Sequence, residues 1–126
     1  MIEILIIMDR RPWSREELIL VFNLYLKLPF GKMHRKTPEV IEMANLIGRS
    51  VNSISIRLGN FASCDPYHQS RGVKGMIDGI KQCQPIWDEF FGNKELLILK
   101  AKEFWQKKKI KPSKTNLMNY FSILKI

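Results

Sequence analysis

Residues 50–61 carry side chains that could meet the edges of DNA bases. On a helix with about 100° per residue, the apolar positions of this segment fall on one face and a polar set falls on the opposite face. Asparagine can bond adenine through two hydrogen bonds, serine can bond a phosphate or a base edge, and an exposed isoleucine can contact the methyl group of thymine. The predicted base contacts are Asn52, Ser53, Ile56 and Asn60, and the predicted core stripe is Val51, Ile54, Leu58 and Phe61.

Basic side chains flank this segment and could bind the phosphates of a DNA backbone. Two of them belong to the segment and to the turn before it, and three belong to the connection over residues 29–36. The net charge of +9 suits a nucleic-acid partner, although basic proteins of this size also have other partners. The predicted phosphate contacts are Lys32, Arg35, Lys36, Arg49 and Arg57.

Two helices joined by a tight turn would position these residues. Thr37 can cap the first helix, and Pro38 suits its first helical position. Gly48 can take the left-handed conformation that ends that helix, and Ser50 can cap the second. This is the layout of a helix-turn-helix, in which the second helix enters a DNA groove. The residues that the helix Pro38–Ile47 is expected to bury are Val40, Ile41, Ala44 and Ile47.

An earlier helix is marked by a capping box, in which Ser14 and Glu17 bond each other's backbone N–H groups. Trp13 and Leu18 occupy the positions of a hydrophobic staple, and Pro29 ends the helix. Three helices would therefore pack in sequence as a trihelical unit. The residues expected to be buried together in this unit are Trp13, Leu18, Phe22, Ala44, Ile54 and Leu58.

The second half of the chain predicts further helices. Asp65-Pro66 can start a short helix, the three glycines over residues 72–82 indicate a loop, and Pro85 opens another segment. Asn93 can cap a final long helix, and residues 113–126 could form one more. We therefore expect an all-α fold, a trihelical helix-turn-helix bundle followed by a helical C-terminal extension. The expected parts are a leader or packing arm (1–9), a helix-turn-helix domain (10–62) and an extension packed on it with a basic tail (63–126).

No residue pattern in the chain indicates catalysis, a metal site or a cofactor. His34 and His68 lack the spaced carboxylate or second histidine of a metal site, and Cys64 and Cys83 form no CxxC pair. The expectations are no enzyme activity, no catalytic residue, no metal and no cofactor. The two widely separated cysteines favour a reduced, cytoplasmic protein. The apolar stretch 1–8 is too short to span a bilayer, so no membrane contact is expected.

The spacing of several motifs resembles known DNA-binding proteins. Residues 13–17 (WSREE), followed by 47–50 (IGRS) and 53–54, resemble the Myb/SANT type of helix-turn-helix. A longer resemblance, over about residues 10 to 100, is to the N-terminal region of bacterial HNH endonucleases of the restriction type. It includes residues 28–31 (LPFG), 46–49 (LIGR), 87–90 (WDEF) and, most specifically, 58–66 (LGNFASCDP).

The resemblance implies a target-binding region without a nuclease domain. The HNH motif needs histidines around a metal, and no histidine follows residue 100. The first hypothesis is accordingly a non-catalytic module that binds double-stranded DNA, with a nuclease subunit or domain as a further partner. The alternative is a protein-interaction module that uses the exposed face of the segment 50–61. Helix–glycine–helix patterns with a polar outer face are common in proteins that bind no DNA.

Overall fold

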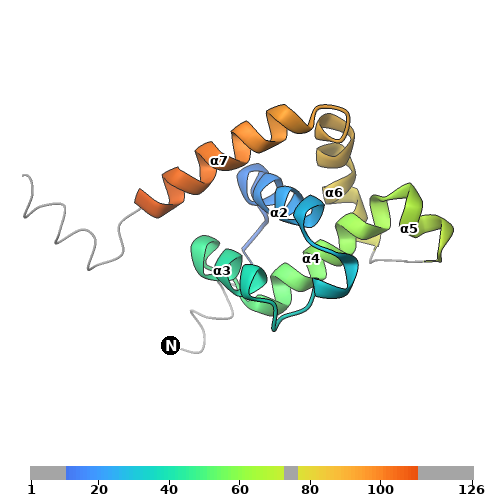
Figure 1. Ribbon diagram of the computed structural model, residues 1–126, viewed down its shortest axis with the longest axis horizontal. Helices are drawn as coiled ribbons and strands as arrows, with labels where there is room; N and C mark the ends of the chain where they lie inside the picture. The colour runs from blue at the N-terminus through green and yellow to red at the C-terminus, as the bar shows by residue number, and fades with distance from the viewer. Residues whose placement is uncertain (1–10, 73–76, 111–126) are drawn as a thin grey trace, which may run out of the picture.

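The protein folds as an all-α structure (Figure 1). The computed structural model describes residues 11–72 and 77–110 of the 126-residue chain, and all regular structure within these ranges is helical. The predictions for residues 1–9 and 113–126 lie outside the described residues. The elements are α2 (Arg15–Lys27), the 3-10 helix η1 (Phe30–Lys32), α3 (Pro38–Ile47), α4 (Val51–Cys64), α5 (Pro66–Ser70), α6 (Ile77–Phe90) and α7 (Lys94–Ile110).

Helix α2 lies in the middle of the molecule, with the longer helices around it (Figure 1). It begins with the predicted capping box: the Ser14 hydroxyl accepts from the Glu17 N–H at 3.1 Å, and the Ser14 N–H donates to the Glu17 carboxylate at 3.0 Å. The residues from Leu18 to Phe22 are all buried, because α2 packs against α7 as well as against α4 and α6. A helical stretch that is apolar on all sides, as over residues 18–22, is typical of the centre of a core.

The turn between α3 and α4 follows the sequence prediction closely. Gly48 takes the left-handed conformation with φ of 70°, and the Ser50 hydroxyl caps α4 by accepting from the Ser53 N–H at 3.1 Å. The predicted side-chain cap of α3 is wrong, because the Thr37 hydroxyl makes no capping bond. The prediction that Ile41 is buried is also wrong. Ile41 is exposed, and Met43 on the same helix is buried.

One continuous core joins the first half of the chain to the second. Phe22 of α2 stacks on Phe61 of α4, with ring centroids 4.9 Å apart, and contacts the tilted ring of Trp87 of α6, at 5.2 Å. Leu97 and Ala101 of α7 belong to the same buried cluster. Of the six residues expected to be buried together, five are buried, and Trp13 is partly buried against the cluster. The core therefore continues across residue 62 into α6 and α7.

The segment 77–82 was expected to lie in a loop, and this expectation is wrong because α6 begins at Ile77. Gly79 occupies a buried position in α6, where the carboxamide of Asn60 from α4 lies against it. A glycine is read from sequence as a loop signal, but here the missing side chain allows two helices to approach closely. Pro85, expected to open a segment, lies inside the same helix.

Gly79→Ala tests this close approach. A Cβ atom added at Gly79 would overlap the Asn60 carboxamide, so the variant is expected to lose about 1–3 kcal/mol of unfolding free energy by overpacking. Gly59→Ala on α4 is the matched control, since a Cβ there meets nothing within 4 Å and should stabilise the helix by about 0.5–1 kcal/mol. Urea denaturation measures the free energy of unfolding of both variants. Equal effects would mean that α6 does not approach α4 closely at residue 79.

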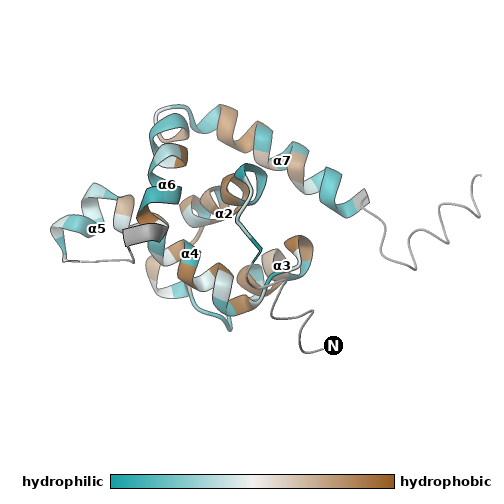
Figure 2. Cartoon of the chain, turned by 180° about the vertical axis from the view of Figure 1, so that it is seen from behind, coloured by the Kyte–Doolittle hydropathy of each residue, from teal (hydrophilic) through white to brown (hydrophobic). Residues whose placement is uncertain are grey.

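Helix α7 begins where it was predicted, directly after Asn93. The Asn93 side chain accepts from the Leu96 N–H at 3.3 Å, Leu97 and Ala101 are buried, and Phe104 and Trp105 are partly buried against the core. Its C-terminal end is hydrophilic (Figure 2) and carries Lys107, Lys108 and Lys109. Among the helices of residues 11–72 and 77–110, none combines the length and apolar character that a membrane crossing needs.

Candidate nucleic-acid interface

The first two turns of α4 present an exposed strip to solvent. Asn52 is exposed, and half of the Ile56 side-chain surface is exposed, at 50%. Ser53 is half-buried, and its hydroxyl accepts a hydrogen bond from the Ser50 hydroxyl at 2.9 Å. Of the predicted base contacts, Asn52 and Ile56 are therefore the two that lie free on one surface, and Ser53 lies at its edge.

Asn60 does not belong to this surface, so its prediction as a base contact is wrong. Only 3% of its surface is exposed, because α6 packs over the second half of α4 and Gly79 lies directly against the Asn60 carboxamide. A helical wheel places Asn60 opposite the apolar stripe, but a second helix covers that side from this turn onward.

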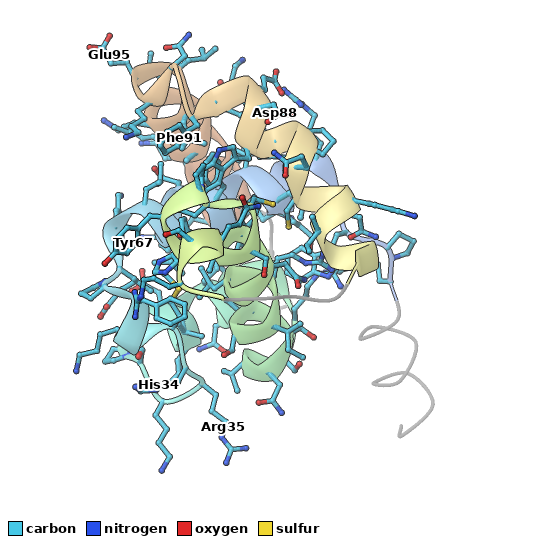
Figure 3. The ribbon with its side chains drawn as sticks, turned by 90° about the vertical axis from the view of Figure 1, so that its right-hand side faces the viewer. His34, Arg35, Tyr67, Asp88, Phe91 and Glu95 are labelled. Atoms are coloured by element: carbon cyan, nitrogen blue, oxygen red, sulfur yellow. The ribbon has the colours of Figure 1, made fainter. Side chains whose placement is uncertain are left out.

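The loop after η1 places basic side chains beside the exposed strip of α4. Lys32, Arg35 and Lys36 are exposed. The Ser55 hydroxyl of α4 donates to the Met33 carbonyl at 2.7 Å, which fixes the loop to the first turns of α4. Figure 3 shows His34 and Arg35 pointing away from the body of the molecule at this end. The three predicted phosphate contacts of this loop are thus accessible.

Arg49 was predicted to bind phosphate, and this prediction is wrong. Its side chain is fully buried and ion-paired with Glu17, donating from Nε to Oε2 at 2.9 Å and from Nη2 to Oε1 at 3.0 Å. The same guanidinium also donates to the backbone carbonyls of Arg11, at 2.9 Å, and Pro12, at 2.8 Å. These bonds use its donors inside the protein, so Arg49 holds the chain before α2 to the α3–α4 turn.

Arg57 was also predicted to bind phosphate, and its guanidinium is directed inward instead. It lies 4.6 Å from the centroid of the Trp13 ring, and the Arg49 guanidinium lies 4.2 Å from the same centroid. The Nε and Nη1 atoms of Arg57 are buried and have no hydrogen-bond partner among the described residues. The attraction of a cation to the face of an indole ring thus helps to keep both arginines inside.

The buried ion pair makes the free energy of unfolding depend on pH in the acid range. Burial acts to raise the pKa of Glu17, but hydrogen bonds from Arg49 and the Ser14 N–H and the nearby arginine charges outweigh it, so the pKa lies below its ordinary value of 4.5. A lowered pKa means that the unfolded chain binds the proton first, so this stability is present above pH 4.5 and is lost as pH falls through the folded-state pKa.

Glu17→Gln should accordingly show a smaller loss of unfolding free energy between neutral pH and pH 3 than the unmodified protein. Urea denaturation across this pH range measures the difference. Parallel pH profiles for the two proteins would show that the Glu17 carboxylate does not carry the acid sensitivity.

The thiols and potential metal ligands of the described residues offer no reactive centre. Burial raises the pKa of Cys64 to about 12 and that of Cys83 to about 11, the latter despite the Arg57 guanidinium beside it. Both thiols therefore stay protonated at neutral pH, and a protonated thiol is a poor nucleophile. Within residues 11–72 and 77–110, no three His, Cys, Asp or Glu side chains gather in a way that could hold a metal ion.

Two surface features escaped the sequence analysis. One is a cluster of Phe30, Tyr67, His68 and Arg71 next to the basic loop. In the sequence, the adjacent aromatic residues at 67–68 and the phenylalanine two residues before Lys32 could have indicated it. The other is a groove of about 510 Å³ between α2, α3 and α7. Its rim carries both lysines and glutamates, so the groove does not select a polyanion. The charged residues of the rim are Lys27, Glu39, Glu42 and Lys102.

Comparisons of the chain with protein-family models, with curated proteins and with solved structures find no match. The case for a function therefore depends on the geometry and charge of the surface formed by the basic loop and α4.

Proposed function

We propose that the protein binds double-stranded DNA through the basic loop 32–36 and the exposed strip of α4. One observation carries this proposal: three exposed basic side chains lie beside Asn52 and Ile56, with no acidic residue in the sequence over either 27–38 or 49–64. No carboxylate of the described residues forms an ion pair with Lys32, Arg35 or Lys36. A surface of one sign next to a polar helix face attracts a polyanion and offers it directional contacts.

The two parts of this surface would have different tasks. Long basic side chains on the loop would bind phosphates and set the position of the duplex. The Asn52 carboxamide would bond the edge of an adenine, and Ile56 would contact a thymine methyl group in the major groove. Burial removes Asn60 and Arg49 from the interface, and the Arg57 guanidinium is directed toward Trp13, so we propose a contact set smaller than the one predicted from the sequence.

We further propose that the chain is the target-recognition part of an HNH endonuclease-like protein and is non-catalytic as it stands. The support for this step is the resemblance of residues 10–100 to the N-terminal region of those enzymes, together with the absence of histidines after residue 100. A nuclease subunit or domain would then supply the chemistry at the site that this module binds.

A pair of variants separates anchoring from base recognition. Arg35→Ala should weaken binding to every duplex alike and lower the salt slope by about one unit, because one phosphate contact is lost. Asn52→Ala should cost about 1–3 kcal/mol on a preferred site and little on random DNA. Fluorescence anisotropy over a salt series measures both, with the preferred site selected from a random pool.

Lys102→Ala is the control for a general charge effect, since Lys102 is an exposed lysine on α7, outside both the basic loop and α4. It should leave both the affinity and the salt slope almost unchanged. If Asn52→Ala weakens every duplex equally, α4 is not the reading helix. If neither Arg35→Ala nor Asn52→Ala changes binding, this surface is not a DNA interface.

A protein partner is the second candidate, and the groove between α2, α3 and α7 favours it. Its lining includes the apolar residues Met43 and Trp105 and the exposed Ile98 of α7. Exposed apolar side chains that gather around a groove are typical of protein interfaces. Such binding would depend weakly on salt, whereas several phosphate contacts give a steep loss of affinity with salt.

A further inference from the structure

Four side chains form an aromatic and cationic cluster beside the basic loop. The Phe30 ring of η1 lies 4.4 Å from the His68 ring of α5, and the Tyr67 ring meets His68 edge-on at 5.0 Å. The Arg71 guanidinium lies 5.3 Å from the Tyr67 ring centroid and 5.9 Å from that of Phe30. We name Phe30, Tyr67, His68 and Arg71 the aromatic cluster.

The two outer rings of this cluster are available to a ligand. Tyr67 is 64% exposed and Phe30 is 41% exposed, whereas His68 is buried behind them. Figure 3 shows Tyr67 on the outside of the molecule, on the side toward the basic loop with His34 and Arg35. Tyr67 meets His68 edge-on, and the plane of Phe30 is inclined by 31° to the His68 ring, so these contacts leave part of each outer ring exposed to a ligand.

Another exposed aromatic ring, that of Phe91, stacks on a buried aromatic ring, whereas Tyr67 contacts His68 edge-on and the Arg71 guanidinium. Phe91 is 40% exposed, but it stacks on the buried Trp87 with ring centroids 4.6 Å apart and planes inclined by 12°. Its surroundings thus account for its position at the surface. The aromatic neighbour of Tyr67 among the described residues is His68, which it meets at 68°.

The aromatic cluster carries the positive charge of Arg71 and lies beside the Asp65 carboxylate. Arg71 forms no ion pair with a carboxylate of the described residues, and its Nη1 lies 3.5 Å from Nδ1 of His68. The nearby Asp65 carboxylate accepts from the Tyr25 hydroxyl at 2.8 Å and from the Tyr67 N–H at 2.9 Å. Lys32 follows Phe30 by two residues within η1, so the cluster and the basic loop form one surface.

We propose that the aromatic cluster stacks unpaired bases of a DNA whose duplex part is held by the basic loop and α4. Exposed aromatic rings next to basic side chains suit single-stranded nucleic acid, because each base offers a face for stacking and each phosphate a charge for pairing. Tyr67 and Phe30 would take the bases, and Arg71 would hold a phosphate between them. The ligand is therefore a duplex with a single-stranded end or gap. This inference rests on the proposed DNA-binding function.

Three labelled DNA probes test the inference on the full chain. They share one duplex and differ at its end: the first is blunt, the second has a single-stranded overhang of thymidines, and the third has an overhang of abasic sites with the same number of phosphates. Stacking of a single base predicts a gain of about 5- to 100-fold in affinity for the thymidine overhang over the abasic one. Charge alone predicts equal affinity for the two overhangs.

Two variants assign this gain to the aromatic cluster. Tyr67→Leu and Phe30→Leu keep apolar side chains but remove the aromatic faces, so each should reduce the gain from bases by at least fivefold while binding of the blunt duplex stays unchanged. Phe91→Leu is the matched control, an exposed aromatic next to Lys94 on another part of the surface, and should change nothing. Thermal unfolding monitored by circular dichroism checks that each variant is folded.

The outcomes separate this inference from the proposed function. Equal affinity for the thymidine and abasic overhangs, with binding of the blunt duplex intact, would overturn the stacking role and leave duplex binding standing. A gain that persists in Tyr67→Leu and in Phe30→Leu would also overturn it. A third outcome is that the blunt duplex does not bind at low salt, whereas the thymidine overhang binds and Tyr67→Leu removes that binding. This would support base stacking by the aromatic cluster and overturn the proposed duplex interface.

Discussion

Glu17→Gln is expected to lower the free energy of unfolding by about 3–5 kcal/mol, because it leaves the buried Arg49 guanidinium without its counter-charge. The Arg49 side chain has no exposed surface, and water cannot take the place of the carboxylate. Glutamine keeps the size of the side chain and the ability to bond the Ser14 N–H in the capping box. The loss therefore reports the charge rather than the cap.

Glu89→Gln is the control, because it removes an arginine–glutamate ion pair that is exposed to solvent. Glu89 also pairs with an arginine, Arg15, through two hydrogen bonds of 2.6 Å, but both side chains are largely exposed. Solvent screens such a pair, and its removal should cost about 0–1 kcal/mol. Urea denaturation with unchanged m-values measures the two variants. Equal losses would show that Arg49 finds another partner or reaches water when Glu17 is neutral.

The sequence predicted the elements whose signals are local. The capping box at Ser14 and Glu17, the left-handed Gly48 and the cap at Ser50 each involve residues within a few positions of one another. Backbone hydrogen bonds of a turn or cap are satisfied inside that short window, so the residue types there determine the outcome. The start of α2 and the α3–α4 turn follow from such signals alone.

The sequence could not predict which arginines are buried. Arg49 meets Glu17 across 32 positions of the chain, and Arg57 reaches the Trp13 ring that Arg49 also contacts. A helical wheel orients a side chain relative to its own helix, but burial depends on what packs against that side. Glu17 was identified as a capping residue, and its second role as counter-ion has no signature in local spacing.

The dependence of burial on distant parts of the chain also explains why the start of α6 and the covered part of α4 were not predicted. Three glycines within eleven residues indicate a loop, yet Gly79 is the position at which α6 approaches Asn60. Once α6 lies there, Asn60 is covered, and the polar face of α4 is reduced to its first two turns. Asn52 and Ile56 stay exposed because they precede this contact. One missed helix thus accounts for both errors.

Leu58→Ala is expected to lower the free energy of unfolding by about 2–5 kcal/mol, because Leu58 is completely buried and its truncation leaves a cavity in the core. Ile56→Ala, two residues earlier on the same helix, should cost about 1 kcal/mol or less, since half of its surface is already exposed. Thermal and urea denaturation of the two variants measure the difference.

DNA binding should rank these two variants in the opposite order. At a temperature where both are folded, Ile56→Ala should lose affinity for a preferred site through the missing apolar contact with a thymine methyl group, and Leu58→Ala should keep it. Leu58 and Ile56, separated by about 200° around α4, would then contribute mainly to stability and mainly to DNA binding, respectively. Equal losses of stability would show that α4 is rotated from the orientation on which the interface depends. A loss of binding in Leu58→Ala alone would mean that the site depends on core packing rather than on the exposed strip.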